Sequence, residues 1–385
     1  EMTSSLVGSE MCIRDRNDIR RNMQYYQMKK LIYLLTALIL FGCGRRQAAV
    51  QVVVAIDSAD SVAIKTITSR CEANSIYHWK TTFNPTESEW AFIREHDIKR
   101  LYLRFFDVAL DNHWLEEQLA PIPIATTVFS QIPSEDMETI PVVYITLDAM
   151  RDMKGQEAEY ADKIVTRVLA MTKRHKIRNV YEIQLDCDWT GTTRESYFKL
   201  CQAARDSLHK QGIALSVTVR LHQLNETLYP PVDRGVLMLY NTGGLKNTET
   251  VNSILDSRNV ESYLKKTITY GIPLDYAYPT FAWGVWFSDG KFRAILHNTN
   301  FSDEEFYQWQ SKNMYKVIKN HYLESHALNT GDIIRLENSD YEEVLKVKKR
   351  VESKLQGYSV ILYHLDSANL SQYTYNEIKN IYDHY

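Results

Sequence analysis

Ile183-Gln184-Leu185-Asp186-Cys187-Asp188-Trp189-Thr190 is a run of residues that alternates between apolar and polar side chains. Because successive side chains of a β-strand point to opposite faces, Gln184, Asp186 and Asp188 would share one face of a strand. A strand of a covered parallel sheet is normally apolar on both faces. Two carboxylates roughly 7 Å apart along a strand on a buried face need charged or hydrogen-bonding partners, or a functional role. The run therefore predicts a polar site inside a barrel.

Runs of strand-forming residues alternate with amphipathic helices along the rest of the chain. The predicted strands are 76–83, 99–107, 140–147, 179–189, 214–222, 234–241, 273–281 and 358–365. The predicted helices are Glu87 to Glu95, Glu157 to Lys176, Arg194 to Lys210, Val260 to Tyr270 and a terminal helix, Tyr373 to Tyr385. Eight such strands with intervening helices predict a closed (β/α)8 TIM barrel over residues 75–385. An open doubly wound sheet would more often begin with a glycine-rich phosphate turn, which the chain lacks.

A long stretch separates the last two predicted strands. It covers residues 288–357 and is highly charged. We expect it to be an insertion, mostly helical, before the last strand of the barrel.

The first part of the chain has the features of a leader and an export signal. We expect residues 1–27 to be a non-native leader, with the natural start at Met28 and a lipoprotein signal peptide at residues 28–43. Lys29 and Lys30 precede an apolar run, Leu31 to Leu40, that is far shorter than the roughly 20 residues of a membrane span. Leu40-Phe41-Gly42-Cys43 resembles a bacterial lipobox, with Phe41 departing from its commonest form. The alternatives are an ordinary signal peptide and an uncleaved anchor.

The lipobox predicts that Cys43 carries lipid and anchors the protein to the cell envelope, most simply the outer membrane. Residues 44–74 would then be a tether containing a short strand, Val50 to Ile56. Gly44-Arg45-Arg46-Gln47 lacks the acidic run of a surface-export signal, which favours the periplasmic side. Apart from Cys12 and Cys43, the cysteines are Cys71, Cys187 and Cys201, an odd number without metal-ligand spacing. A net charge of -3 gives no basic field for nucleic acid.

The fifth predicted strand repeats the two-faced pattern of the fourth. In Leu215 to His222, the polar face carries Ser216, Thr218, Arg220 and His222. Adjacent barrel strands would bring Arg220 and His222 close to Asp186 and Asp188, and Lys80 and Arg104 could join them from the first two strands. The alternative is a buried ion-pair network without chemistry, which gives little net stabilisation because each charge must be desolvated.

Two motifs carry a resemblance to a known family. Leu185-Asp186-Cys187-Asp188-Trp189-Thr190 is similar to the strand-four signature of glycoside hydrolase family 18, the chitinase-like barrels, in which alternating aspartates lead to a catalytic glutamate. Met238-Leu239-Tyr240-Asn241 is similar to that family's strand-six motif, whose tyrosine and following acid or amide hold the substrate's N-acetyl group. The chain also resembles bacterial lipoproteins with a hydrolase-like barrel over residues 75–385.

The sequence departs from this family at the residue on which catalysis depends. Thr190 stands where the resemblance would place the proton-donating glutamate. A general acid needs a pKa near the working pH, which a threonine hydroxyl does not have. The family's glycine motif on strand three is also missing, because the segment reads Val143-Tyr144-Ile145-Thr146-Leu147-Asp148. The family's substrate-assisted mechanism therefore does not transfer to this chain.

Other carboxylates and several aromatic residues follow the predicted strands, at the end where barrel active sites lie. The carboxylates are Asp107, Asp148, Glu226 and Asp366. Two of them at about 5–10 Å from each other could act as acid and base on a sugar, although each taken alone is more often a helix cap or a solvated loop charge. The aromatic residues are Trp189, Tyr240, Phe281, Trp283, Trp286 and Phe287. Aromatic faces pack on the apolar faces of sugar rings, but several of these residues could equally be core, Trp189 above all.

These observations predict a glycoside hydrolase-like, carbohydrate-active lipoprotein that acts on or binds a glycan at the carboxyl-terminal mouth of the barrel. The candidate catalytic residues are Asp186, Asp188, Asp148 and Asp366, and the candidate substrate-binding residues are Arg220, His222, Tyr240, Asn241 and Trp283. The alternative from another class is a non-catalytic glycan-binding or scaffold barrel. A metal-dependent hydrolase is a third possibility if Asp186, Asp188, His222 and His364 converge, but no spacing requires it. No cofactor and no nucleic-acid partner is expected.

Overall fold

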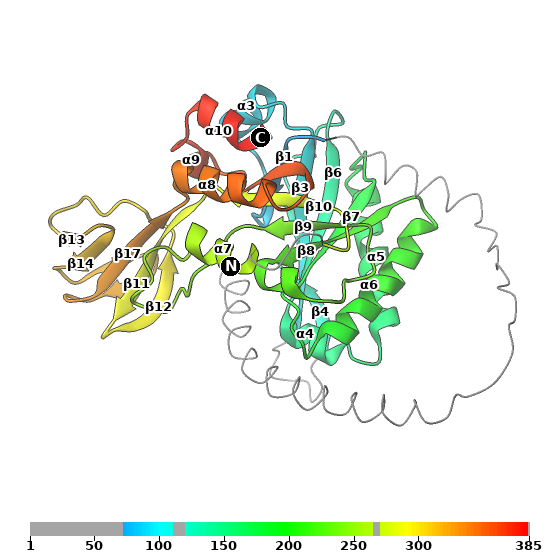
Figure 1. Ribbon diagram of the computed structural model, residues 1–385, viewed down its shortest axis with the longest axis horizontal. Coiled ribbons are helices and arrows are strands. Elements are labelled where there is room, and N and C mark those ends of the chain that lie inside the picture. Colours follow the sequence, from blue (N-terminus) through cyan, green and yellow to red (C-terminus); the bar gives the residue numbers. More distant parts are fainter. Residues whose placement is uncertain (1–71, 111–119, 265–269, 384–385) are drawn as a thin grey trace, which may run out of the picture.

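The computed structural model describes residues 72–110, 120–264 and 270–383. Its centre is a closed barrel of eight parallel strands (Figure 1). In chain order the strands are β1 (Ser75–His78), β3 (Arg100–Leu110), β6 (Glu138–Ile145), β7 (Glu182–Asp186), β8 (Ala214–Arg220), β9 (Arg234–Met238), β10 (Leu274–Pro279) and β18 (Gly357–Tyr363). Pairing of β1 with both β18 and β3 closes the barrel. The fold is the predicted (β/α)8 TIM barrel.

Short elements decorate the barrel at its first strands. β4 (Pro121–Ile124) pairs antiparallel with the end of β3, and β2 (Thr82–Phe83) pairs with β5 (Val128–Phe129). The first strand is shorter than predicted, since β1 ends at His78. Lys80 consequently lies beyond the strand.

Amphipathic helices cover the outside of the barrel. They are α3 (Glu87–Glu95), α4 (Leu147–Asp152), α5 (Glu157–Arg174), α6 (Arg194–His209), α7 (Ser257–Leu264), α8 (Tyr341–Glu352), α9 (Ser367–Leu370) and α10 (Tyr375–Tyr382), together with a 3-10 helix, η1 (Leu221–Asn225). In α5 the buried residues Tyr160, Ile164, Val168 and Met171 recur at helical spacing, which places one apolar stripe on the strands. In the described part of the chain, no helix is both long and apolar enough to cross a membrane.

The apolar face of the central run packs under α6. Trp189 is 2% exposed, and its ring lies 5.3 Å from that of Phe198 and 6.5 Å from that of Tyr197. Cys187 and Cys201 are buried free thiols. Trp189 is therefore a core residue, and the two cysteines behave as the small buried hydrophobes that the sequence predicts.

The insertion before the last strand is present, but the prediction that it is mostly helical was wrong. Its main part is an antiparallel sheet in the order β12-β11-β17-β14-β13. The strands are β11 (Ala282–Ser288), β12 (Lys291–Leu296), β13 (Tyr307–Ser311), β14 (Met314–Val317) and β17 (Ile333–Asn338), and a separate hairpin is formed by β15 (His321–Leu323) and β16 (His326–Leu328). Among the described residues of this stretch, only α8 is helical.

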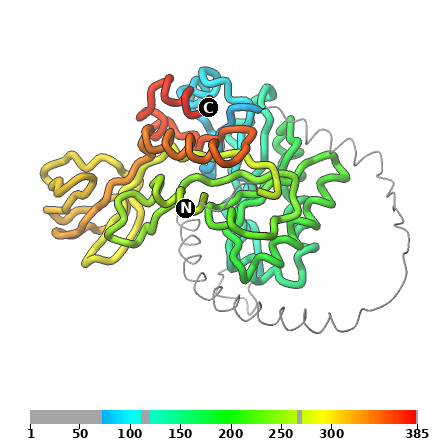
Figure 2. The backbone as a smooth tube through the Cα atoms, in the orientation of Figure 1, coloured from blue at the N-terminus to red at the C-terminus, as the bar shows by residue number. Residues whose placement is uncertain are grey.

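The insertion projects from one side of the barrel, with β13 and β14 at its far tip (Figure 1). The chain leaves the barrel after β10 and returns through α8 to β18, as the yellow-to-orange part of the tube shows (Figure 2). The register along β13 and β14 shifts between Trp309 and Ser311. One face of the sheet has its own small core, which includes Phe301, Tyr307 and Ile334.

Candidate functional site

Arg220 binds both aspartates of the central run. β7 and β8 are parallel neighbours in which Gln184 lies opposite Ser216, so Asp186 and Arg220 come together further along the same face. The Arg220 Nη2 lies 3.0 Å from Asp186 Oδ1, and its Nε donates to Asp188 Oδ1. The side chains of Asp186 and Asp188 are 5% and 3% exposed, whereas that of Arg220 is 15% exposed. One guanidinium group thus neutralises part of a buried pair of carboxylates.

The two aspartates differ in their surroundings. Asp186 also accepts a hydrogen bond of 2.6 Å from the Thr218 hydroxyl. Burial raises the pKa of Asp186 and the neighbouring charge of Asp188 adds to the rise, while Arg220 opposes it. In Asp188 the second oxygen, Oδ2, is buried and has no hydrogen-bond partner among the described residues. A buried acceptor without a partner is costly, so this oxygen is a candidate contact for a ligand donor.

A polar and aromatic layer fills the barrel below the aspartates. The Tyr77 hydroxyl on β1 donates to Gln184 on β7 over 2.6 Å, and Gln184 donates to the Ser216 hydroxyl over 3.4 Å. The strands β1 and β7 are not neighbours in the sheet, so the first of these bonds crosses the interior. The polar face of β7 therefore points into the barrel, as its alternation predicts.

Aromatic rings adjoin the aspartate pair at the carboxyl end of the barrel. The Tyr240 and Tyr363 rings lie 4.9 Å apart, and the Phe281 ring lies 6.0 Å from Tyr240 and 5.8 Å from Tyr363. The Trp283 ring is 4.9 Å from Phe281. We call Tyr363, Tyr240, Phe281 and Trp283 the aromatic row. Burial raises the pKa of both Tyr240 and Tyr363, and the charge of Asp186 adds to the rise.

The sequence did not single out three of the aromatic residues at this end. They are Tyr363, Tyr144 and Trp79, whose ring lies 5.9 Å from that of Tyr363. Burial and the charge of Asp188 raise the pKa of Tyr144, which places its hydroxyl near the pair. In the structure, Trp79 follows β1, Tyr144 lies one residue before the end of β6, and Tyr363 ends β18. The sequence did not show this, because the predicted strands 76–83, 140–147 and 358–365 extend past these residues.

Trp283 and Asn241 occupy different environments. Trp283 is 1% exposed and donates its indole N–H to Glu337 over 2.7 Å, so it forms the inner end of the aromatic row. Asn241 directly follows Tyr240 and has a φ of 55°, a conformation that asparagine tolerates better than most residues. Its Oδ1 is buried without a partner among the described residues. Of the two, only Asn241 offers an unused acceptor.

Each of the remaining candidate carboxylates is ion-paired. Asp107 is bound by Arg104 at 2.9 and 2.5 Å, Asp148 by Arg151 at 2.5 Å, Glu226 by Arg194 at 3.0 Å and Asp366 by Lys80 at 3.0 Å. Asp148 has a side chain that is 72% exposed. Asp366 caps α9 by accepting from the Asn369 N–H. The structure thus gives Asp148 and Asp366 local roles, and Lys80 joins Asp366 and Glu89.

The histidines that the structure describes do not assemble a metal site. His222 lies half-buried in η1, directly after β8. His364 follows β18, and the charges that act on it come from Asp366, Lys80 and Glu89. In the three described ranges, no group of three or more His, Cys, Asp or Glu residues could hold a metal ion. The convergence of Asp186, Asp188, His222 and His364 that a metal-dependent hydrolase would need is therefore absent.

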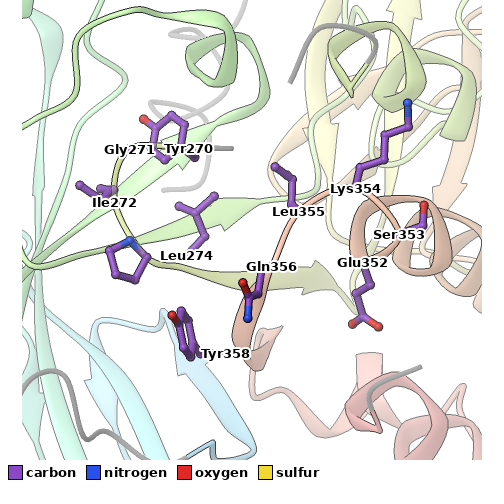
Figure 3. A pocket seen from close by; sticks show the side chains of 11 residues that line it. Tyr270, Gly271, Ile272, Leu274, Glu352, Ser353, Lys354, Leu355, Gln356 and Tyr358 are labelled. Atoms are coloured by element: carbon purple, nitrogen blue, oxygen red, sulfur yellow. The ribbon is translucent and has the colours of Figure 1, made fainter. Parts of the chain in front are cut away.

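A separate cavity lies at the opposite, amino-terminal end of the barrel strands. Its volume is about 590 Å³, and it is lined by residues 270–274, 352–356 and Tyr358 (Figure 3). These residues precede β10, follow α8 and begin β18. Active sites of this fold lie at the other end of the strands, so this cavity is not the candidate site.

Comparisons with known proteins found similar solved structures but no similar sequence. No family model and no curated protein sequence matches the chain. Among solved structures, a chitinase from Chromobacterium violaceum is similar over 81% of this chain and 99% of its own, with 11% identity and a TM-score of 0.48. A Group IV chitinase from Ostrinia furnacalis is similar over 80% of this chain and 98% of its own, with 12% identity and a TM-score of 0.47. The spore cortex-lytic enzyme SleL from Bacillus cereus is similar over 82% of this chain and 75% of its own, with 13% identity and a TM-score of 0.46.

Proposed function

We propose that this protein binds a glycan at the carboxyl-terminal mouth of its barrel and does not cleave it. The observation that carries the proposal is that unpartnered acceptors and aromatic rings occur together there. Asp188 Oδ2 and Asn241 Oδ1 are acceptors without partners among the described residues, and the aromatic row lies beside them. A sugar offers hydroxyl or amide donors on its rim and apolar C–H groups on its faces, which match these two features.

The arrangement of the carboxylates supports binding without hydrolysis. Each candidate acid is held by an arginine or a lysine. A neighbouring cation favours the ionised form of a carboxylate, and the ionised form cannot donate a proton. At Asp186, burial opposes this effect by raising the pKa. At the position where the family resemblance would place the catalytic glutamate, Thr190 is 5% exposed and its hydroxyl hydrogen-bonds to that of Thr192.

Hydrolysis is a second candidate because of one residue. Burial raises the pKa of Asp186, and a raised pKa is what a carboxyl group needs to act as a general acid. Release of product from chromogenic glycosides, lost on Asp186→Asn, would favour hydrolysis over binding alone. Absence of turnover together with measurable binding would favour the proposed function.

Calorimetric titration with a panel of soluble oligosaccharides, including those of N-acetylglucosamine, tests the binding proposal. Asn241→Gly keeps the positive φ and removes the amide, so we expect it to weaken binding about tenfold, the loss of roughly one hydrogen bond at 1.4 kcal/mol. Asn179→Gly is the matched control, because Asn179 also has a positive φ of 56° and precedes β7 at the other end of the strand. No binding and no turnover across the panel would refute both candidate functions.

We further propose that Cys43 carries lipid and holds the protein at the bacterial cell envelope, on the periplasmic side of the outer membrane. Cys43 and residues 44–71 of the tether lie outside the described residues. The support is the lipobox after the short apolar run, together with the missing acidic run after the cysteine. Stable anchoring needs more than one lipid chain, so a processed lipoprotein should be labelled by radioactive fatty acid.

A further inference from the structure

A buried ion pair joins the insertion to the segment that follows β9. Arg335 and Glu337 both lie on β17, and each is 1% exposed. The Arg335 Nε donates to Glu337 Oε1 over 2.6 Å. Its two terminal nitrogens donate to the carbonyl oxygens of Leu245 and Asn247 over 2.9 and 2.7 Å. An arginine of the insertion thus holds the backbone of residues 241–256, which connect β9 to α7.

The second oxygen of the Glu337 carboxylate makes two more hydrogen bonds. We call Arg335, Glu337 and the groups that they bind the joint. Its Oε2 accepts from the Ser253 hydroxyl over 2.5 Å and from the Trp283 indole over 2.7 Å. Ser253 belongs to the segment 241–256, whereas Trp283 lies on β11 and ends the aromatic row. The carboxylate therefore contacts the segment, the sheet and the row simultaneously.

Further hydrogen bonds link the insertion to the segment 241–256. Asn252 donates to the Asn338 carbonyl over 2.8 Å, and Asn313 donates to the carbonyls of Val251 and Leu336 over 2.9 and 2.7 Å. These bonds involve residues at the edge of the insertion, where solvent competes with them. Glu337 and Arg335 differ because they are buried, where a directional bond is stronger and costlier to lose.

The joint connects directly to the candidate site. The segment 241–256 begins at Asn241, next to Tyr240, and β11 begins next to Phe281. The Phe281 ring lies between Trp283 and the pair Tyr240 and Tyr363. Loss of Glu337 would remove one bond to Trp283 and one to the segment together.

We propose that Glu337 is a positioning residue that fixes the aromatic row and Asn241 in the geometry that binds a glycan. The inference rests on the proposed function, since it assumes that the mouth binds sugar. Glu337 itself contacts no ligand, because it is buried under β11 and the segment. Its role is to set the relative placement of two chain segments that arrive from different strands of the barrel.

Energetics distinguish this role from simple stabilisation. Replacing a buried ion pair by apolar residues of similar volume is often neutral or stabilising. In Arg335→Met/Glu337→Leu the two charges disappear together and no uncompensated buried charge remains, so we expect the variant to stay folded. Its melting temperature should fall only by the loss of the bonds to neutral partners. The same variant loses the directional bonds to Leu245, Asn247, Ser253 and Trp283. Positioning therefore predicts weaker binding in a protein that is still stable.

The test is calorimetric glycan titration and amide hydrogen exchange on the full chain, in the parent protein and in Arg335→Met/Glu337→Leu. We expect about tenfold weaker binding and faster exchange in residues 241–256, with unchanged exchange in the barrel strands. The matched control is Lys319→Met/Glu305→Leu, which removes an exposed ion pair of the same insertion and should change neither readout.

The possible results separate failure of the positioning role from failure of the proposed function. Parent-like affinity in the stable double variant would overturn the positioning role, as would unchanged exchange in residues 241–256. If the parent protein binds no glycan, the proposed function fails, and the exchange measurement still decides whether Glu337 fixes the segment. If the double variant unfolds, Glu337→Gln with Arg335 retained is measured by exchange in the same way, and unchanged exchange in that variant would overturn the inference.

Discussion

Replacing Arg220 with methionine should destabilise the protein by an amount that depends on pH. The substitution leaves Asp186 and Asp188, with side chains 5% and 3% exposed, without their cation. Breaking a buried pair by removing one partner typically costs about 3–5 kcal/mol. At about 2.1 cal/mol/K of unfolding entropy per residue, this corresponds for roughly 300 folded residues to a fall in melting temperature of about 5–8 °C near neutral pH.

The pH dependence follows from the sign of the pKa change. Without Arg220, two buried carboxylates repel each other, and one of them would hold a proton well above its unfolded pKa of about 3.9. A group whose pKa is raised by folding costs stability above its unfolded pKa, and the cost grows by about 1.4 kcal/mol per pH unit until the folded pKa is reached. The deficit of Arg220→Met should therefore be smaller at pH 5 than at pH 8.

Urea unfolding at pH 5, 6.5 and 8 measures this deficit directly. Arg220→Met/Asp188→Asn removes one of the two like charges and should recover part of the loss at pH 8. Arg94→Met is the control, because Arg94 pairs with Glu87 between side chains that are 61% and 82% exposed, and such pairs contribute little. A deficit that is absent, or equal at the three pH values, would refute the reasoning.

Other predictions concern single residues elsewhere. Asp186→Ala removes the acceptor of Thr218 and one contact of Arg220, so it should lower stability by about 3 kcal/mol in urea unfolding, and an unchanged midpoint would contradict the burial of the pair. Burial lowers the pKa of His78 to about 3 and that of His364 to about 4. Because both are neutral when folded but gain a proton when unfolded below about pH 6.5, stability should fall by about 1.4 kcal/mol per histidine and pH unit from there down to pH 4.5, and His78→Asn/His364→Asn should flatten this slope. Cys43→Ala should release the protein from the membrane fraction, and a variant as membrane-bound as the parent would remove the lipoprotein proposal.

The barrel could be predicted because its signal is local. Alternation in β7 and β8 identified the inward face, and the common direction of neighbouring strands placed Arg220 opposite the aspartates. The roles of single loop residues were harder to predict, because whether Asp366 caps a helix or faces a cleft depends on where α9 begins. Burial of Trp283 also depends on a partner, Glu337, that lies 54 residues further along the chain.

The insertion was mispredicted for a physical reason. β17 has apolar residues on one face, but its other face carries Arg335 and Glu337, which are buried only because they bind each other and the segment 241–256. Hydrophobic alternation assumes that charged side chains face solvent. The alternation in Ile334-Arg335-Leu336-Glu337 is the pattern of a strand, and the high overall charge of residues 288–357 concealed it.

The barrel and the five-stranded sheet of the insertion differ in how they end. The barrel closes on itself through β1, so its eight strands leave no free row of backbone donors and acceptors. In the sheet of the insertion, β12 and β13 are outermost, and β13 exposes 61% of Trp309. The register shift next to Trp309 interrupts regular pairing there. The open edge and the exposed tryptophan nevertheless make β13 the strand at which unwanted association between molecules should begin. Trp309→Lys should improve solubility at high concentration and leave the barrel unchanged.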